Sequence, residues 1–282
     1  MSFALSSRTL AAAPSAAAEE GFTPPGPGDF NLPPVGPSDT FEFLGQTMYL
    51  GVTKPMIQLV LGAVLVFWFF YAAAKKRSMV PGKLQYAGEG AYGFIRNSVG
   101  RDIIGSQDFM RFVPYLVTLF FFILVNNIFA TVPFIQFPTF SRAGMVYGLA
   151  GLSWVIYNYV GIRKHGFGGY MKLQTVPAGI KGPMLLLLVP LEFFSNLVVR
   201  PITLALRLFA NMLAGHLLLI LFALGGEYLL LHGATLVKPV GILAWVLFVA
   251  IAFLELLVQF LQAYVFTLLN AMYISGALAD EH

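Results

Sequence analysis

Residues 200–222 read RPITLALRLFANMLAGHLLLILF and lie inside an apolar run that extends from about 183 to 226. Residues 253–273 read FLELLVQFLQAYVFTLLNAMY and lie inside a second apolar run, from about 236 to 278. One helical crossing of the hydrocarbon core needs only about 20 apolar residues. The two runs therefore predict long membrane-embedded helices.

The composition excludes whole classes of protein. Of the 282 residues, 58% are hydrophobic and only 11% are charged, whereas about 25% of the residues of a soluble domain are charged. A soluble enzyme of this size would lack the charge to cover its surface. The absence of cysteine excludes disulfides and thiolate sites, and the four histidines lack the spacing of a zinc site. We expect no metal and no cofactor, and the net charge of +4 is too small to indicate nucleic acid.

Three shorter apolar runs precede the two long ones. They cover residues 56–74, 112–132 and 144–162, and each has the length of a single spanning helix. Together the runs predict an all-α polytopic membrane protein with about five to six hydrophobic helices in a membrane domain over residues 51–282. Residues 1–50 are Ala-rich and then Pro- and Gly-rich, which predicts a largely extended or disordered tail outside the membrane.

The basic residues of the loops indicate an orientation. If the N-terminus lies outside, the inner loops 75–111 and 163–182 carry eleven Lys and Arg residues, against four on the outer side. Such an excess marks the cytoplasmic side, so we expect the N-terminus outside and the C-terminus in the cytoplasm. The start of the chain is a poor transit peptide, which favours a bacterial plasma membrane over the alternative, a mitochondrial inner membrane.

Arg207 is the most informative residue of the first long run. A guanidinium at membrane depth costs about 2.5–3.5 kcal/mol on insertion scales. Apolar residues continue from Arg207 to Leu224, which is too far for the side chain to reach an interface. Arg200, beside Pro201, is instead expected to extend toward an interface from a helix end. At 3.6 residues per turn, one helix face carries Arg200, Thr203, Arg207, Asn211 and Ala214.

The second long run carries one polar stripe. Glu255, Gln259, Gln262, Phe266 and Asn270 recur at helical spacing on an otherwise apolar helix. In lipid such a stripe has to face protein or a water-filled crevice. His216 on the first run offers an imidazole to match the Glu255 carboxyl. We expect the helix with Arg207 and His216 and the helix with Glu255 and Gln262 to pack with these faces opposed. Imidazole and carboxyl groups exchange protons near neutral pH while amides hold water, which indicates proton transport.

Arg207 has a different task, because a guanidinium keeps its proton. It repels a passing hydronium and favours proton release from a carboxylate brought beside it. Glu192 lies some four turns away along the same run. A moving carboxylate on a partner is therefore expected beside Arg207.

These motifs resemble the signature helices of subunit a of the F-type ATP synthase, the stator channel beside a rotating c-ring. The likeness lies in LRLFANMLAGH at 206–216, in FLELLVQFLQAYVFTLLNAMYISGAL at 253–278, and in the run at 89–133 that begins with EGAYGFIRNSVG and ends with NNIFATVP. It implies a proton-translocating, non-catalytic subunit that neither binds nor hydrolyses ATP. It also implies three partners: the c-ring, peripheral-stalk b-type subunits and the lipid membrane.

The resemblance assigns roles to individual residues. Arg207 matches the family's essential arginine, Asn211 its companion asparagine, and Gln262 the glutamine of its last helix. Many bacterial members have a carboxylate at the position of His216 and an imidazole at that of Glu255, so this chain has the pair exchanged. The family also implies that both long segments are steeply tilted around the c-ring. Thr203 and Glu192 are candidates for the inner half-channel, with capping or packing as equally supported roles.

Two other functions stay open on the sequence. A secondary carrier for organic anions would use Arg207 as a carboxylate clamp, although the internal repeats typical of carriers are not evident. A membrane scaffold would use the polar residues only to join helices. The sequence does not distinguish proton from sodium transport.

Overall fold

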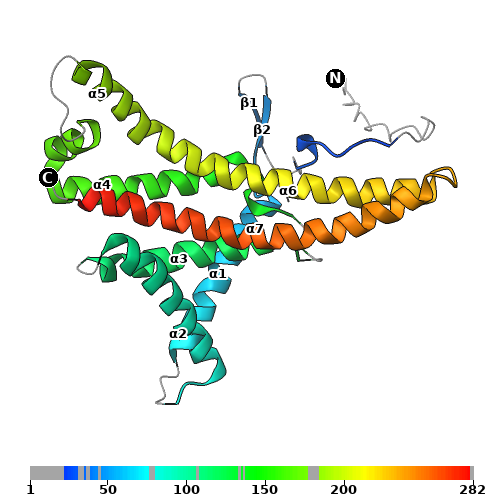
Figure 1. Ribbon diagram of the computed structural model, residues 1–282, viewed down its shortest axis with the longest axis horizontal. Helices are drawn as coiled ribbons and strands as arrows, with labels where there is room; N and C mark the ends of the chain where they lie inside the picture. Colours follow the sequence, from blue (N-terminus) through cyan, green and yellow to red (C-terminus); the bar gives the residue numbers. More distant parts are fainter. Residues whose placement is uncertain are drawn as a thin grey trace, which may run out of the picture.

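The structure, a computed structural model, describes residues 22–30, 35, 39–43, 46–75, 80–105, 108–132, 135, 137–176 and 184–279. Five of its helical segments are long and apolar enough to cross a membrane. They are Lys54–Lys75, Phe109–Ile128, Ala143–Thr175, Leu186–Leu231 and Lys238–Leu278. The prediction of an all-helical membrane fold with five to six hydrophobic helices is confirmed (Figure 1).

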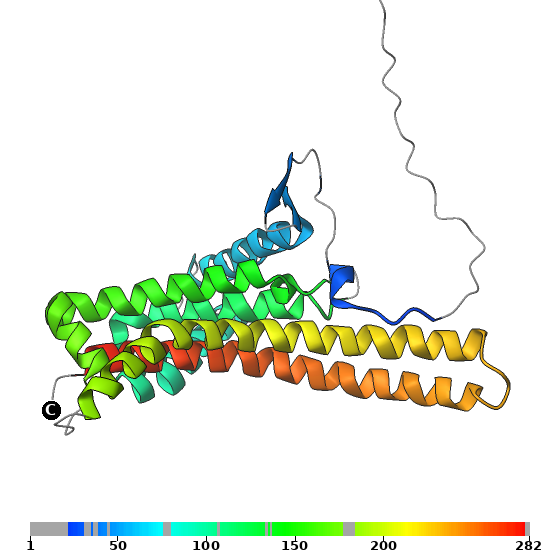
Figure 2. The same cartoon turned by 90° about the horizontal axis from the view of Figure 1, so that it is seen from above.

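The last two segments form the long axis of the molecule. After α5 (Met184–Phe194) and the π-helical turn η4 (Ser195–Val199), helix α6 spans Arg200–Leu231 and helix α7 spans Lys238–Leu278. Figures 1 and 2 both show α6 and α7 side by side as an antiparallel hairpin. At 1.5 Å per residue they are about 48 and 60 Å long, whereas the hydrocarbon core is about 30 Å thick. A bilayer can accommodate helices of this length only if they tilt or bend.

Helix α4 (Ala143–Thr175) contains the predicted span 144–162 and then folds back on itself. The kink lies at Gly166, whose φ of 72° is a conformation that side chains rarely adopt. The fold-back brings the buried ring of Tyr170 against Gly161, where an added Cβ would lie 2.1 Å from that ring. Glycine at 161 is therefore a packing requirement, which the apolar pattern alone does not reveal.

The segment between the first two spans contains helices that the sequence reasoning did not predict. Helix α1 (Lys54–Lys75) is followed by α2 (Lys83–Ile95), the π-helix η2 (Arg96–Ile104) and α3 (Phe109–Ile128). Glycines lower helix propensity, and α2 contains three of them. One of them, Gly88, lies so close to α1 that an added Cβ would be 2.6 Å from the Cβ of Ala73. Helix α2 thus depends on close packing against α1.

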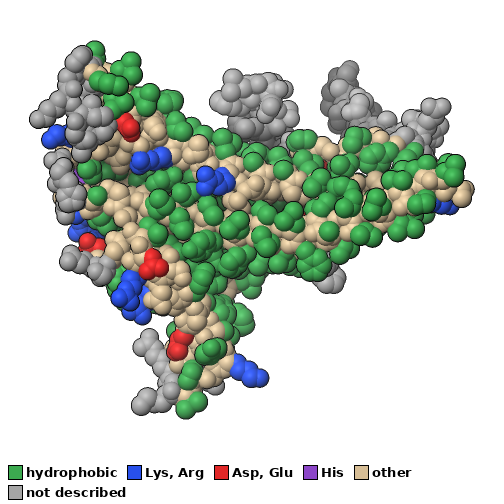
Figure 3. Space-filling view, viewed as in Figure 1, with side chains coloured by type: hydrophobic (Ala, Val, Ile, Leu, Met, Phe, Trp, Pro, Cys, Tyr) green, Lys and Arg blue, Asp and Glu red, His purple; other side chains and the backbone are tan. Residues whose placement is uncertain are grey.

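The core lies where α3, α4, α6 and α7 meet. Leu116, Phe120 and Ile123 of α3 are almost fully buried there, together with Leu208 of α6 and Phe266 of α7. The outer surface is also apolar: in Figure 3 hydrophobic side chains cover most of the α6–α7 hairpin, and basic groups appear on α6 and at the hairpin tip. An apolar core inside an apolar exterior is the pattern of a protein dissolved in lipid.

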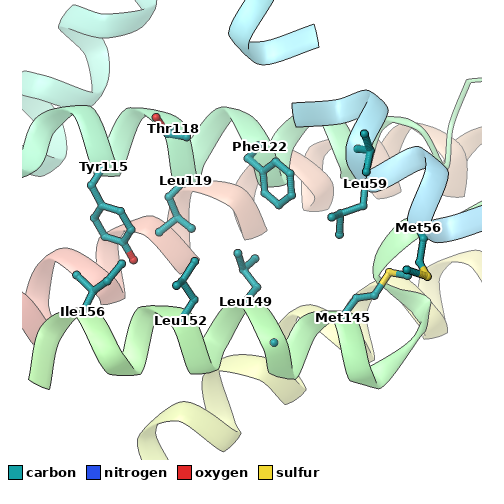
Figure 4. A pocket seen from close by; sticks show the side chains of 12 residues that line it. Met56, Leu59, Tyr115, Thr118, Leu119, Phe122, Met145, Leu149, Leu152 and Ile156 are labelled. Atoms are coloured by element: carbon teal, nitrogen blue, oxygen red, sulfur yellow. The ribbon is translucent and has the colours of Figure 1, made fainter. Parts of the chain in front are cut away.

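A cavity of about 610 Å³ opens between α1, α3 and α4 (Figure 4). Its lining contains no charged side chain. The two polar groups on it are already bonded, because the Tyr115 hydroxyl donates to Ser153 and the Thr118 hydroxyl donates to the backbone oxygen of Pro114. We therefore place neither an ion path nor an anion site in this cavity.

The part of the N-terminal tail that the structure describes is short. Strand β1 (Asp39–Phe43) pairs antiparallel with strand β2 (Gln46–Leu50), and a 3₁₀ turn, η1, spans Pro27–Phe30. These strands are the exception to the helical fold. The expected extended or disordered structure of residues 1–21 falls outside the described residues.

Candidate functional site

His216 of α6 and Glu255 of α7 face each other where the two helices pack. The Nδ1 atom of His216 lies 4.0 Å from Oε1 of Glu255, and the two side chains are 10% and 5% exposed. Gly215 precedes the histidine, and a Cβ added there would lie 3.4 Å from the Glu255 carboxyl carbon. A side-chain Cβ at position 215 would therefore meet the carboxyl at ordinary van der Waals distance, which shows how close Glu255 lies to α6. An imidazole and a carboxyl at this distance exchange a proton after a small movement or through one water.

Gln259, one turn along α7, connects Glu255 to the end of α3. Its side-chain nitrogen donates to Oε1 of Glu255 at 3.4 Å, and its side-chain oxygen accepts from the Thr131 hydroxyl at 3.0 Å. Asn127 donates to the backbone oxygen of Gln259 at 3.0 Å, which ties α3 to α7 at the same level. Sequence reasoning did not include Thr131 or Asn127 among the site residues. No helical periodicity links them to α7, since they belong to a separate apolar segment.

The rest of the polar stripe is also turned toward protein. Glu255, Gln259, Gln262, Phe266 and Asn270 are all buried. Antiparallel packing with His216 opposite Glu255 places Gln262, about 10 Å further along α7, between the levels of Arg207 and Asn211. The expectation that the stripe faces the interior is therefore met by the geometry.

Arg207 points the other way. It is exposed, as are Thr203, Ala210 and Ala214, so α6 presents one arginine within a strip of small side chains. Asn211 is half-buried and lies at the edge of that strip rather than on it. Within the described ranges Arg207 has no hydrogen bond or ion pair to another residue. The residues predicted to share one face of this run therefore lie partly on the exterior and partly at the contact between helices.

Thr203 and Glu192 are placed away from the His216–Glu255 pair. The Thr203 hydroxyl donates to the backbone oxygens of Val199 and Arg200, at 2.9 and 3.0 Å. Glu192 of α5 accepts from Asn196 at 3.2 Å, toward the far end of the α5–α6 segment. The structure therefore does not bring Glu192 to Arg207.

Arg200 packs against protein at the start of α6. Its guanidinium lies 5.4 Å from the ring centroid of Tyr273 on α7, within the range of a cation–π interaction. In the π-helical turn just before it, the Leu197 carbonyl accepts from the Trp154 indole at 2.9 Å. Arg200 therefore packs on an aromatic ring where the sequence reasoning expected extension toward an interface.

Phe30, from the N-terminal turn η1, covers the histidine. Its ring lies edge-on to His216 with centroids 5.8 Å apart, and it also packs on Phe137 at 6.1 Å. Figure 2 shows this turn beside α6. A residue almost 190 positions away in the sequence thus forms one wall of the site. No part of the chain that the structure describes gathers three or more His, Cys, Asp or Glu residues as a metal site would.

Comparison with known proteins identifies the family. The model of the family described as "ATP synthase A chain" matches residues 56–275. ATP synthase subunit a of a Nocardioides species is 72% identical over 264 residues, which cover 93% of this chain and 95% of the relative. The subunits a of Pseudarthrobacter chlorophenolicus and Streptomyces lividans are 48% and 41% identical, over 93% and 81% of this chain and 95% and 80% of theirs. The chain therefore belongs to the family of subunit a of ATP synthase, a membrane-sector family of ATP synthesis and proton transport.

Proposed function

We propose that this chain is the proton-translocating stator subunit of the ATP synthase membrane sector, with two offset half-channels that Arg207 separates. The observation that carries the proposal is the opposite orientation of the polar groups. His216 and Glu255 are buried between α6 and α7, whereas Arg207 is exposed on the outer face of α6. One helix hairpin thus offers a proton-exchanging pair inside and a permanent cation outside.

The exposed arginine supports a partner that carries a carboxylate. A guanidinium facing lipid is costly, and the small side chains of Thr203, Ala210 and Ala214 leave room for another helix to approach. A carboxylate brought beside Arg207 loses its proton more readily. A c-ring carboxylate passing this strip meets that requirement, and the long helices α6 and α7 provide the surface for the ring.

The buried pair supports the outer half-channel. Protons enter past His216 and Glu255, with Gln259 next to the carboxyl. Arg207 lies about 13 Å along α6 from His216. Asn211 and Gln262 lie between this pair and Arg207. These amides do not carry protons themselves, but they order the water that does. Protons thus reach the ring carboxylate on one side of Arg207.

The inner half-channel lies on the other side of Arg207. Thr203 is exposed one turn before the arginine, and Glu192 lies further along the same segment. These positions suit an exit path on the side where α5 begins. We place this side in the cytoplasm, with the N-terminus outside a bacterial plasma membrane and b-type peripheral-stalk subunits as further partners. The subunit itself neither binds nor hydrolyses ATP.

The experiment is Arg207→Ala in the assembled ATP synthase, reconstituted into vesicles. Each proton that crosses 100 mV carries about 2.3 kcal/mol, and a leak around the ring dissipates it. We expect ATP synthesis and ATP-driven proton pumping to be lost, while passive proton flow through the membrane sector persists. The matched control is Leu206→Ala, which truncates an exposed neighbour on the same helix and is expected to keep synthesis. Synthesis at the normal rate in Arg207→Ala would refute the proposal.

A further inference from the structure

Thr131 contacts Gln259, the neighbour of the buried pair, from the turn that follows α3. It lies three residues after the end of α3, in a turn closed by a bond from its backbone nitrogen to the oxygen of Ile128 at 2.9 Å. Its hydroxyl donates to the side-chain oxygen of Gln259 at 3.0 Å. Asn127 holds the Gln259 backbone oxygen from the same helix end. Two hydrogen bonds, from Thr131 and from Asn127, therefore fix the end of α3 relative to Gln259.

The contact with Thr131 provides a partner for the end of the Gln259 amide that does not face Glu255. An amide carries an acceptor oxygen at one end and a donor NH₂ at the other. Because the oxygen accepts from Thr131, the nitrogen faces Oε1 of Glu255, at 3.4 Å. An NH₂ group only donates, and a bond donated to a carboxyl favours its ionised form.

We propose that Thr131 is a positioning residue for proton transfer at Glu255, acting through the orientation of the Gln259 amide. The proposal rests on the proposed role of Glu255 in the outer half-channel. With Glu255 ionised, the amide NH₂ donates to the carboxylate and the amide oxygen accepts from the Thr131 hydroxyl. With Glu255 protonated, the amide turned by half a rotation accepts from the carboxyl O–H and donates to the Thr131 oxygen.

A hydroxyl serves both orientations because it both donates and accepts. No proton passes through the amide, which only turns. The proton that Glu255 binds or releases is exchanged with water or with the imidazole of His216. A valine at position 131 forms a hydrogen bond with neither end of the amide, whereas a serine can bond either end.

The surroundings of Glu255 leave few other groups to set its protonation. His216 faces it from α6, Gln259 from α7, and Thr131 acts from the end of α3. The N-terminal turn contributes the apolar ring of Phe30, which contacts the histidine. Among the described residues, no Lys, Arg, Asp or second Glu lies within ion-pair distance of Glu255.

The test compares variants of the assembled complex in vesicles by passive proton flow as a function of the pH on the outer side. We expect Thr131→Val to lower passive proton flow by about tenfold across the pH range, because one end of the buried Gln259 amide then lacks a partner in either orientation and the amide is no longer held beside Glu255. Thr131→Ser is expected to restore the wild-type flow, and Thr131→Val is expected to cause no further loss in a Gln259→Leu background.

The chain offers a matched control. The Thr139 hydroxyl is buried and donates to the side-chain oxygen of Gln58 at 3.4 Å, which is the same kind of contact at a place that does not touch Glu255. Thr139→Val is expected to leave the flow unchanged. If Thr131→Val fails to assemble, Thr131→Ala removes the same hydroxyl without adding bulk, and its flow decides.

The outcomes separate this inference from the proposed function. Wild-type flow in Thr131→Val, with flow blocked in Glu255→Gln, would overturn the role of Thr131 and leave that of Glu255 intact. Wild-type flow in Glu255→Gln would overturn the proposed outer half-channel itself. A serine variant that behaves like the valine variant, or a valine effect that persists without Gln259, would show that Thr131 does not act through its hydroxyl.

Discussion

Exchanging His216 and Glu255 tests whether the two residues act as a pair. Unit charges 4.0 Å apart interact by about 4 kcal/mol at an effective dielectric constant of 20. His216→Glu alone sets two carboxyls at that distance, and the repulsion keeps one of them protonated. Glu255→His alone sets two imidazoles there. If half of the 4 kcal/mol appears in the barrier to transfer, each single variant is about 30-fold slower, whereas the exchange restores an acid and an imidazole.

The assay is ATP-driven acidification of vesicles that contain the reconstituted complex, together with passive proton flow. ATP hydrolysis and the subunit content of the purified complex show that each variant assembles. We expect the exchanged variant to recover to within a few-fold of the wild-type rate. His232→Glu makes the same substitution at an exposed position at the end of α6 and is expected to have no effect. An exchanged variant slower than both single variants, or a loss equal to the product of the two single losses, would refute the pairing.

Two further predictions concern packing around the site and the fold. Gly161→Ala drives a Cβ into the ring of Tyr170 and is expected to destabilise the subunit by about 1–3 kcal/mol, measured as a lower thermal midpoint of the complex. Gly151→Ala, which meets open space on the same helix, is the control. Equal midpoints for the two variants would refute the packing argument. Because the chain has no native cysteine, His216→Cys reports access to the site by the rate of labelling with a water-soluble maleimide. Phe30→Ala removes the ring that covers position 216 and is expected to raise that rate, and an unchanged rate would show that the N-terminal turn does not cover the site.

The sequence was most informative at residues that are energetically unfavourable in contact with lipid. The five apolar segments follow from length alone, because a bilayer admits only helices or closed barrels. The polar stripe from Glu255 to Asn270 follows from helical periodicity, and the structure buries all of it. Arg207 stands out because a charge at membrane depth has to have a partner. The sequence and the physics of the membrane thus lead to the same few residues.

The sequence was least informative where a contact joins separate segments. Helix α2 contains three glycines, and its packing against α1 depends on Gly88. The fold-back of α4 depends on Gly166 and on the space that Gly161 leaves for Tyr170. Neither local propensity nor hydropathy reports such close approaches, because both are sums over neighbours along the chain.

By itself, then, the sequence determined the membrane class, the five apolar helical segments, the family motifs and the identity of the ionisable residues in the apolar runs. The pairing of His216 with Glu255 was expected from the sequence, and the structure places the two side chains together. Only the tertiary structure decided that Arg207 faces outward, and that Thr131 and Phe30 complete the site from distant segments. The physical reason is that periodicity defines which residues share a face of one helix. Which faces meet depends on the packing of all the helices together.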